Sequence, residues 1–411
     1  MQENNFNKND LENELLNKLL DENKSFTTSK ILEHVINMLM KAERKIHLQE
    51  NDNDKGNGYY DRKLGTPVGA LDLLVPRARD GDFRPQVLPD PFIRDSEDRF
   101  NTLQALFLSS YPPNSINSIF NSLGLRYSKD ELDKLKDQYL ADFEAWNKRQ
   151  LPNDVIGIFI DAYVSEVKDN DKVKKMTTFV ILGFDFNGFK DIYSIELHIG
   201  NESKEFWLSA FNKLISRGLT NPLFLVSDDF SGIIDTVKTL FPNSLHQLCY
   251  VHLKRNIRKN MAKSDAKQLN DKLTLLKSSP THEQAVDDFK KLLSDYKDKY
   301  PHFVKYTIAR AEYYFNFTHL PLDVRKYFYT TNAVESFNSI FNSIIEKKRN
   351  LAGGFFQSME YLKANVYLHY LRLKSKKWAK PTPFIKANLY SFNQLFATRF
   401  NRSPYLKTQY S

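Results

Sequence analysis

The stretch that most constrains the fold of this chain is the apolar run Val155–Ile160, which is rich in β-branched residues and leads directly into Asp161. A short run of this composition predicts a strand buried on both faces of a sheet. A buried strand ends on a carboxylate where the charge meets solvent, a cation or the N-terminus of a helix. This segment alone leaves open whether Asp161 terminates the strand or binds a ligand.

The composition is that of a globular chain with a basic balance. Of the 411 residues, 41% are hydrophobic and 13% aromatic, which fits about two to four domains. The net charge of +9 is compatible with a polyanionic partner such as nucleic acid, but many other proteins share it. The single cysteine, Cys249, excludes an internal disulfide and favours the cytoplasm. The chain opens without an apolar signal-peptide core and contains no run of about 18 apolar residues, so we expect no membrane span.

The first part of the chain predicts two small regions. Residues 1–50 carry two helical patterns, which form either half of a helix-turn-helix or a helical hairpin used for packing or dimerisation. Residues 51–94 predict a small β-containing element with one or two strands, and its turn carries Arg77, Arg79 and Arg84. These arginines either contact DNA phosphates and the minor groove or lie on a solvated turn.

Helical patterns return over residues 95–150. Two of the predicted helices are joined by residues 124–128, and this arrangement fits a helix-turn-helix that binds DNA. The second of them opens on Ser128 with Glu131 three residues later, the spacing of a capping box. The spacing of the two helices is not specific for a helix-turn-helix by itself.

Residues 151–252 give the most informative pattern. After the opening strand, the chain predicts two strands joined by an Asn187-Gly188 turn, a helix, a buried strand that leads into Asp228, a short helix and a further strand. This is the order of a ribonuclease-H-like mixed sheet, in which the first and fourth strands are neighbours. Two parallel neighbours that each end on a carboxylate bring Asp161 and Asp228 to the same edge of the sheet. The pair favours a ligand site over two unrelated strand ends.

The remainder of the chain predicts helices. Residues 253–325 are charged and lack a strand-like run, which predicts an all-helical insertion. Residues 326–411 open with a helix that carries Glu335 on its polar side, and they continue as a helical C-terminal region. Asn332-Ala333-Val334-Glu335 is also a capping box, so Glu335 has either a structural or a functional role. The helix closes with the basic residues Lys347, Lys348 and Arg349.

Short motifs follow one another in a fixed order from about Gly58 to Lys380. They are Leu64-Gly65-Thr66, Val75-Pro76-Arg77, Gly81-Asp82-Phe83-Arg84-Pro85, Trp146-Asn147-Lys148-Arg149-Gln150-Leu151, Phe159-Ile160-Asp161-Ala162-Tyr163, Gly200-Asn201-Glu202-Ser203, Trp207, Arg217-Gly218-Leu219, Val226-Ser227-Asp228, Phe241-Pro242, Cys249-Tyr250-Val251-His252-Leu253-Lys254-Arg255-Asn256, Thr330-Thr331-Asn332-Ala333-Val334-Glu335 and Gly353-Gly354-Phe355. Each motif alone is weak, whereas the ordered set is specific. It resembles the Mutator-type transposases of insertion sequences, a branch of the Asp-Asp-Glu recombinases.

The resemblance implies a catalytic and metal-binding triad at Asp161, Asp228 and Glu335. It implies an α/β fold in which a ribonuclease-H-like mixed-sheet catalytic core carries an all-helical insertion, follows mainly helical DNA-binding modules and precedes a helical C-terminal region. Two Mg²⁺ ions, for which Mn²⁺ is expected to substitute, would be held by the three carboxylates. Asp229 is a departure, since the family usually has glycine there.

The function implied is that of a DNA transposase. Such an enzyme binds the terminal inverted repeats of its element, cleaves to free a 3′-hydroxyl and joins that hydroxyl to target DNA. We expect it to act as a homodimer or higher homo-oligomer, in the cytoplasm and associated with the nucleoid. The alternative is a domesticated DNA-binding protein or regulator that retains the fold without the chemistry. A plain nuclease with a ribonuclease-H-like core would lack the additional N-terminal and C-terminal modules.

Two groups around the predicted site have competing interpretations. His246, Cys249 and His252 are spaced in threes, but a structural zinc site takes four ligands with cysteine pairs, so we favour a supporting role for Cys249 and His252 in the active site. The second group is a basic cluster on the helix that follows, and it forms either a DNA track or a solvated face; we favour DNA. This cluster comprises Lys254, Arg255, Arg258 and Lys259.

Overall fold

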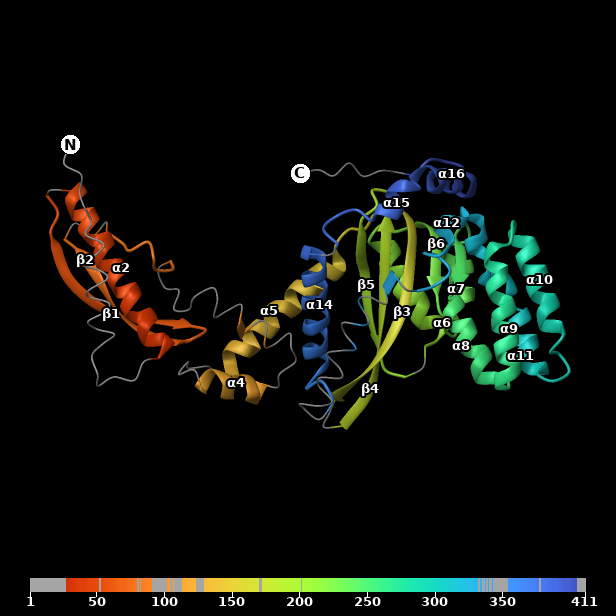
Figure 1. Cartoon of the computed structure of the whole chain (residues 1–411), viewed down its shortest axis with the longest axis horizontal. Helices are drawn as coiled ribbons and strands as arrows, with labels where there is room; N and C mark the ends of the chain where they lie inside the picture. The colour runs from red at the N-terminus through yellow and green to blue at the C-terminus, as the bar shows by residue number, and fades with distance from the viewer. Residues whose placement is uncertain are drawn as a thin grey trace. The chain divides into compact units, whose positions relative to one another are not determined.

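In the computed structural model, the chain forms two compact units, Met1–Leu135 and Lys136–Ser411 (Figure 1). The structure describes residues 27–404, with gaps at 52, 80, 82, 91–101, 104–105, 107–112, 123–128, 170–171, 201, 332, 335–336, 338, 340–341, 343–353 and 377. The first of the two N-terminal helical patterns therefore lies outside the described residues. So does the joint at residues 124–128 on which the helix-turn-helix prediction depends.

The first unit is built around a helix packed on a two-stranded hairpin. Helix α2 (Thr28–Glu50) covers the antiparallel strands β1 (Gly56–Thr66) and β2 (Gly69–Ala78). Apolar residues at alternate strand positions are buried against Ile36 and Met40 of the helix; they are Leu64, Leu71, Leu73 and Val75. The alternation follows from the pleat of a strand, which sends successive side chains to opposite faces. The β-containing element, for which one or two strands were predicted, has two.

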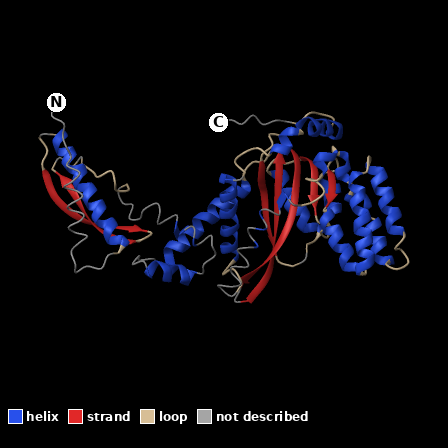
Figure 2. Ribbon diagram, in the orientation of Figure 1, coloured by secondary structure: helices blue, strands red, loops and turns tan. Residues whose placement is uncertain are grey.

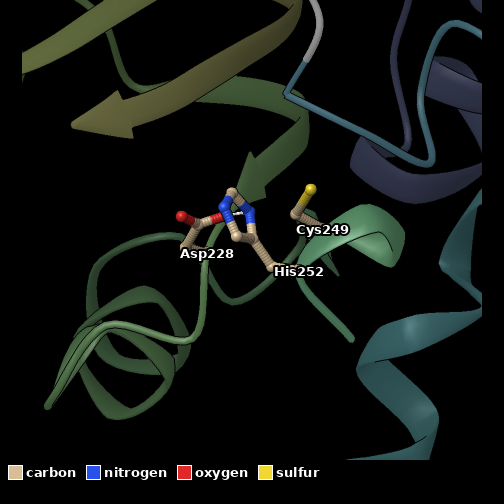
Figure 3. A group of neighbouring side chains, drawn as sticks. All are labelled: Asp228, Cys249 and His252. Atoms are coloured by element: carbon tan, nitrogen blue, oxygen red, sulfur yellow. Dashed lines mark ion pairs between the residues drawn. The ribbon is translucent and has the colours of Figure 1, made fainter. Parts of the chain in front are cut away.

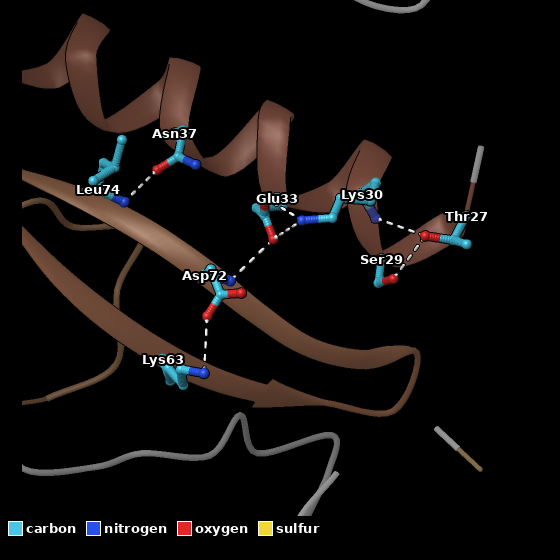
Figure 4. Close-up of polar contacts among 8 residues, drawn as sticks. All are labelled: Thr27, Ser29, Lys30, Glu33, Asn37, Lys63, Asp72 and Leu74. Atoms are coloured by element: carbon cyan, nitrogen blue, oxygen red, sulfur yellow. Dashed lines mark hydrogen bonds and ion pairs between the residues drawn. The ribbon is translucent and has the colours of Figure 1, made fainter. Parts of the chain in front are cut away.

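Polar side chains of α2 satisfy the backbone along β2 (Figure 4). Glu33 accepts a hydrogen bond from the amide of Asp72 at 3.0 Å, and Asn37 accepts one from the amide of Leu74 at 2.9 Å. Thr27 caps the start of the helix by accepting from the amide of Lys30. An edge strand with free amides invites pairing with another chain, and this helix removes that opportunity along β2.

The helices that follow are α4 (Pro113–Ser122) and α5 (Lys129–Lys148). Within the second unit, the later part of α5 packs through Phe143 and Trp146 against α14 (Met359–Lys376). The rings of Trp146 and Tyr370 are 4.8 Å apart. A helix from the predicted 95–150 region is therefore part of the core of the second unit.

The second unit contains a mixed five-stranded sheet with the order β5-β4-β3-β6-β7 (Figure 2). Its strands are β3 (Asp154–Asp169), β4 (Lys172–Asp185), β5 (Lys190–His198), β6 (Asn221–Ser227) and β7 (Leu245–Leu248). The strands β3, β4 and β5 are antiparallel neighbours, whereas β3, β6 and β7 are parallel. The first and fourth strands of this region are therefore adjacent and parallel, as the order of elements predicts.

The central strand corrects one expectation. We predicted that the opening strand ends at Asp161, but β3 continues to Asp169, and Asp161 lies midway along it. The prediction failed because it took a continuous apolar run as the sign of the strand. The residues after Asp161 instead alternate between buried and exposed positions, as in a hairpin with one face in solvent. Beyond the last pairing with β6, the edge of β3 bonds instead to the backbone of Phe356.

Helices cover both faces of the sheet and make two separate cores. On one face, Ile158, Ile160 and Leu225 pack against α6 (Lys204–Ser216) and α7 (Ile233–Leu240). On the other face, the rings of Phe159 and Phe224 lie 5.5 and 5.0 Å from Phe328. Since every second residue faces the same way, the sheet residues nearest the predicted site are divided between these two cores.

Residues 250–325 are all described and contain helices but no strand. They form α8 (Tyr250–Asn260), α9 (Lys263–Leu275), η1 (Leu276–Ser278), α10 (His282–Ser294), α11 (Pro301–Ile308), η2 (Ala311–Tyr314), η3 (Asn316–His319) and α12 (Leu322–Arg325). We call this segment the helical insertion. The guanidinium of Arg325 is buried within it and donates to four backbone carbonyls, those of Lys277, Ser279, Thr318 and Leu320.

The C-terminal helices are α14, α15 (Pro383–Ala387) and α16 (Leu389–Phe400). They are anchored to the start of the central strand, because Arg402 makes a two-pronged ion pair with the fully buried carboxylate of Asp154, at 2.6 and 2.7 Å. A buried carboxylate requires such a partner, since an unpaired charge in the interior is costly. Among the helices that the structure describes, none combines the length and apolarity needed to cross a membrane.

Candidate active site

The register of the two parallel central strands brings Asp161 and Asp228 level with each other. Phe159 on β3 pairs with Val226 on β6, so each aspartate lies two residues beyond a matched pair. Both residues share the parity of these partners, which face the core that contains Phe328. Asp161, in the middle of β3, and Asp228, just after the end of β6, thus follow the same matched pair by two residues.

Asp228 contacts the first helix of the helical insertion (Figure 3). Its carboxylate forms an ion pair with Nδ1 of His252 on α8. Burial lowers the pKa of His252, but hydrogen bonds with Asp228 and Cys249 outweigh this and raise it to about 10. Nη1 of Arg255 lies 2.9 Å from the other ring nitrogen, Nε2, and a guanidinium can only donate. Asp228 therefore lies against Nδ1 and the guanidinium of Arg255 against Nε2, so neither ring nitrogen is open to a further ligand.

Cys249 lies where three segments of the chain meet. Its amide donates to the carbonyl of Ser227 at 2.7 Å, and its sulfur lies 3.7 Å from the hydroxyl of Thr331. The amide of the next residue, Tyr250, donates to the carbonyl of Tyr329 at 2.8 Å. These contacts fix the end of β6, the start of α8 and the segment before residue 332 against one another. One donor atom each from Asp228, Cys249 and His252 lie within 4.8 Å of one another.

A cavity of about 260 Å³ opens beside these residues. Its lining includes Asp161, Cys249, His252 and Arg255, together with Ser339 and Asn342 from the predicted Glu335 helix. The cavity therefore unites residues from the central strand, the insertion and the region after residue 326. The cysteine, the histidine and Arg255 lie in the same cavity as the first aspartate.

The third predicted carboxylate, Glu335, lies outside the described residues. Its described neighbours Val334 and Phe337 are buried in the core, as the predicted apolar face of this helix requires. The carbonyl of Ala333 accepts a hydrogen bond from the ammonium group of Lys190 on β5, and burial lowers the pKa of this lysine to about 8. The basic residues Lys347, Lys348 and Arg349 also lie outside the described part of the chain.

The predicted basic groups lie in both units. On α8, Arg258 and Lys259 are exposed, while Lys254 is half-buried and donates to the hydroxyl of Thr274 at 2.7 Å. Burial, followed by the nearby charges of Lys277 and Arg258, lowers the pKa of Lys254.

In the first unit, Arg77 stacks on the ring of Tyr60 at 5.6 Å. The amide of Arg79 bonds to Asp54 and to the carbonyl of Lys55, and Arg84 donates to the carbonyl of Pro89. These arginines also serve local structure.

Some contacts around the site have no sequence signal, even where the residues that make them belong to a motif. Thr331 meets Cys249 across 82 residues of chain, and Arg255 bonds to the supporting histidine rather than pointing freely from the helix. Asp229 is bonded to Tyr306 and Arg310 of the helical insertion. Neither residue of that insertion belongs to a motif, and only the fold places them near the sheet.

Comparison with known proteins identifies the family to which these motifs belong. The family described as "Transposase, Mutator family" matches residues 2–356, which is most of the chain. The chain belongs to the Mutator family of transposases. Membership of this family implies action on DNA.

Its relatives include named transposases of insertion sequences. The chain is 28% identical over 273 residues to "Probable transposase for insertion sequence element" of Corynebacterium diphtheriae, covering 64% of this chain and 77% of that protein. It is 27% identical over 285 residues to "Transposase for insertion sequence element IS256 in transposon Tn4001" of Staphylococcus aureus, covering 67% and 73%. It is 25% identical to "Probable transposase for insertion sequence element ISRM3-like" of Sinorhizobium fredii over 93% of each chain.

We expect substitution of His252 by alanine to lower DNA cleavage by this Mutator-family transposase about 10–100-fold, because partners that orient a metal-binding carboxylate have effects of this size. The imidazole holds Asp228 through Nδ1, and alanine removes that contact. Initial rates of cleavage on a DNA fragment that carries the ends of the element measure the loss. Substitution of the exposed Asn256 on the same helix by alanine is the control and should leave the rate unchanged. An unchanged rate in His252→Ala would contradict the supporting role.

Proposed function

We propose that this transposase cleaves DNA at the ends of its element and joins the freed 3′-hydroxyl to target DNA, with Asp161, Asp228 and Glu335 as the catalytic carboxylates on a ribonuclease-H-like sheet. The observation that carries the proposal is the parallel pairing of β3 and β6, in which the matched pair Phe159 and Val226 lies two residues before Asp161 and Asp228. The family match supports the reaction class. Sequence spacing supports the third acid, since Glu335 precedes Ser339 by four residues and Asn342 by seven, the spacing of one helix face.

The donor atoms fit magnesium better than zinc. Asp161 and Asp228 offer hard carboxylate oxygens, which Mg²⁺ prefers, and Mn²⁺ accepts the same ligands. Zinc would need His252 as a ligand, but this ring faces Asp228 through one nitrogen and Arg255 through the other. The guanidinium also places a permanent positive charge beside any cation bound at the ring. When bound, divalent ions supply charge neutralisation for the attacking and leaving oxygens of a phosphodiester.

The chain's own groups position the reactants in this proposal. Asp161 and Asp228 would hold the divalent ions that neutralise the scissile phosphate, while His252 holds Asp228 in place. The exposed Arg258 and Lys259 extend the positive charge along α8, where it can contact the phosphates of the DNA backbone. Water attacks first and leaves a 3′-hydroxyl, and this hydroxyl then attacks a phosphodiester of the target and releases its 3′-oxygen. Bringing two inverted repeats together requires at least two copies, so we propose a homodimer or higher homo-oligomer that works on the nucleoid.

The test is a cleavage assay on DNA that carries the ends of the element. We expect nicked ends bearing a 3′-hydroxyl, and joined products when target DNA is added, in Mg²⁺ or Mn²⁺ but not in EDTA. Restoring Mg²⁺ after EDTA should restore cleavage, which separates metal removal from loss of the protein. Cleavage that persists undiminished in EDTA would contradict the metal-dependent mechanism. Binding of the ends without cleavage in any divalent metal would favour the alternative, a regulator that retains the fold.

A further inference from the structure

The side chain of Asp229 turns toward the helical insertion. Its Oδ2 lies 2.7 Å from Nε of Arg310 and accepts a hydrogen bond from the hydroxyl of Tyr306 at 2.6 Å. The guanidinium of Arg310 also stacks on the Tyr306 ring, 3.6 Å from its centre. The carboxylate is 12% exposed and the Arg310 side chain 26%, so the contact is more shielded than a surface ion pair. We call these three residues the Asp229 cluster.

Three consecutive residues at the end of β6 make contacts in three directions. Ser227 hydrogen-bonds to buried His246 on β7, and Asp228 pairs with His252 on α8. Asp229 holds the end of the insertion's fourth α-helix, α11, and the residues just after it. The loop after β6 is therefore attached to the neighbouring strand and to two separate helices of the insertion. A glycine at position 229 would offer no side chain for the last of these attachments.

We propose that Asp229 is a positioning residue, which fixes the loop that carries Asp228 against the helical insertion through Tyr306 and Arg310. The inference rests on the proposed function in taking Asp228 as a catalytic carboxylate. The Asp229 cluster holds the loop without using either oxygen of Asp228, so it does not compete with the function of that carboxylate. Catalysis is sensitive to such support, since a displacement of about 1 Å at a reacting group costs on the order of 10²-fold in rate.

The experiment compares Asp229→Ala, Arg310→Ala and the double variant. At saturating DNA, each single variant should cleave element ends about 10–100-fold more slowly, with Kd for the ends changed less than about twofold. The double variant should be no slower than the slower single variant, because both substitutions break the same contact. Asp229→Asn keeps an acceptor oxygen for Tyr306 and Arg310 and should retain more activity than Asp229→Ala. If Asp229→Ala does not fold, Asp229→Asn still tests the contact.

Matched controls remove a charge nearby without touching the Asp229 cluster. Asp235→Ala removes an exposed carboxylate from α7, and Lys305→Ala removes an exposed ammonium group from α11; both should cleave at the wild-type rate. Wild-type cleavage by Asp229→Ala would overturn the inference. The inference would also be overturned if the losses in rate multiplied in the double variant and the Kd for the ends rose. That result would mean that Arg310 binds DNA and does not act through Asp229. Activity retained in Asp228→Asn would instead contradict the proposed function.

Discussion

Replacing Asp161 or Asp228 by asparagine is expected to lower the rate of DNA-end cleavage by about 10³-fold or more, because stabilisation of the transition state by bound metal is worth several kcal/mol and each 1.4 kcal/mol is tenfold in rate. Asparagine preserves the size of the side chain but removes the negative charge that a divalent ion requires. Strand transfer from DNA that is already cut should fall by a similar factor, since the proposed mechanism uses the same carboxylates in both steps. Cleavage and joining are measured separately, on intact and on pre-cut ends.

The two steps also need a binding control. Both variants should bind the ends of the element with a Kd close to that of the wild-type protein, because neither carboxylate attracts the DNA backbone. Asp235→Asn, on the exposed face of α7, removes a carboxylate outside the cavity and should have wild-type cleavage. If Asp161→Asn or Asp228→Asn retained full cleavage, that residue would have no place in the catalytic site. Glu335→Gln tests the third acid in the same way.

Replacing Arg325 by methionine is expected to lower the free energy of unfolding by about 3–5 kcal/mol, since buried carbonyls that lose their donor retain the cost of desolvation. The guanidinium joins four carbonyls from two parts of the helical insertion, at Lys277 and Ser279 on one side and at Thr318 and Leu320 on the other. Methionine fills similar space but donates nothing to them. Denaturant unfolding followed by circular dichroism measures the change.

Two further variants sharpen this prediction. Arg258→Met removes an arginine from the exposed face of α8 and should change the free energy of unfolding by no more than about 0.5 kcal/mol. Arg325→Lys should recover little of the lost stability, because an ammonium group lacks the fixed fork of a guanidinium and cannot meet all four carbonyls. A stability equal to that of the wild-type protein in Arg325→Met would show that solvent or other donors satisfy these carbonyls.

The sheet was the most predictable part of the second unit, because each of its strands has a local signal. The apolar runs before Asp161 and Asp228 predicted the two central strands, and their parallel pairing is confirmed. The length of β3 was not predictable from the same run, since the hairpin beyond Asp161 alternates between buried and exposed residues. Its edge there is satisfied by Phe356, about 190 residues later, and no local pattern reports such a partner.

The candidate site was predictable where its residues lie in motifs. Cys249 and His252 follow β7 directly, and the structure brings both to Asp228. The role of Asp229 was not predictable, because its partner Tyr306 lies 77 residues away on a helix whose exposed face looks ordinary in sequence. Side-chain contacts between distant segments depend on how helices pack, and this packing is decided by shape and not by periodicity.

The ion pair between Asp154 and Arg402 has a consequence for the order of events on the ribosome. Asp154 begins the first strand of the sheet to be synthesised, yet its partner emerges 248 residues later. Until then, the carboxylate lacks its two-pronged ion pair with Arg402, and the start of the strand is less suited to early burial. Transposase chains terminated before residue 402 are therefore expected to remain incompletely folded. Such fragments would be substrates for proteases rather than competitors for the ends of the element.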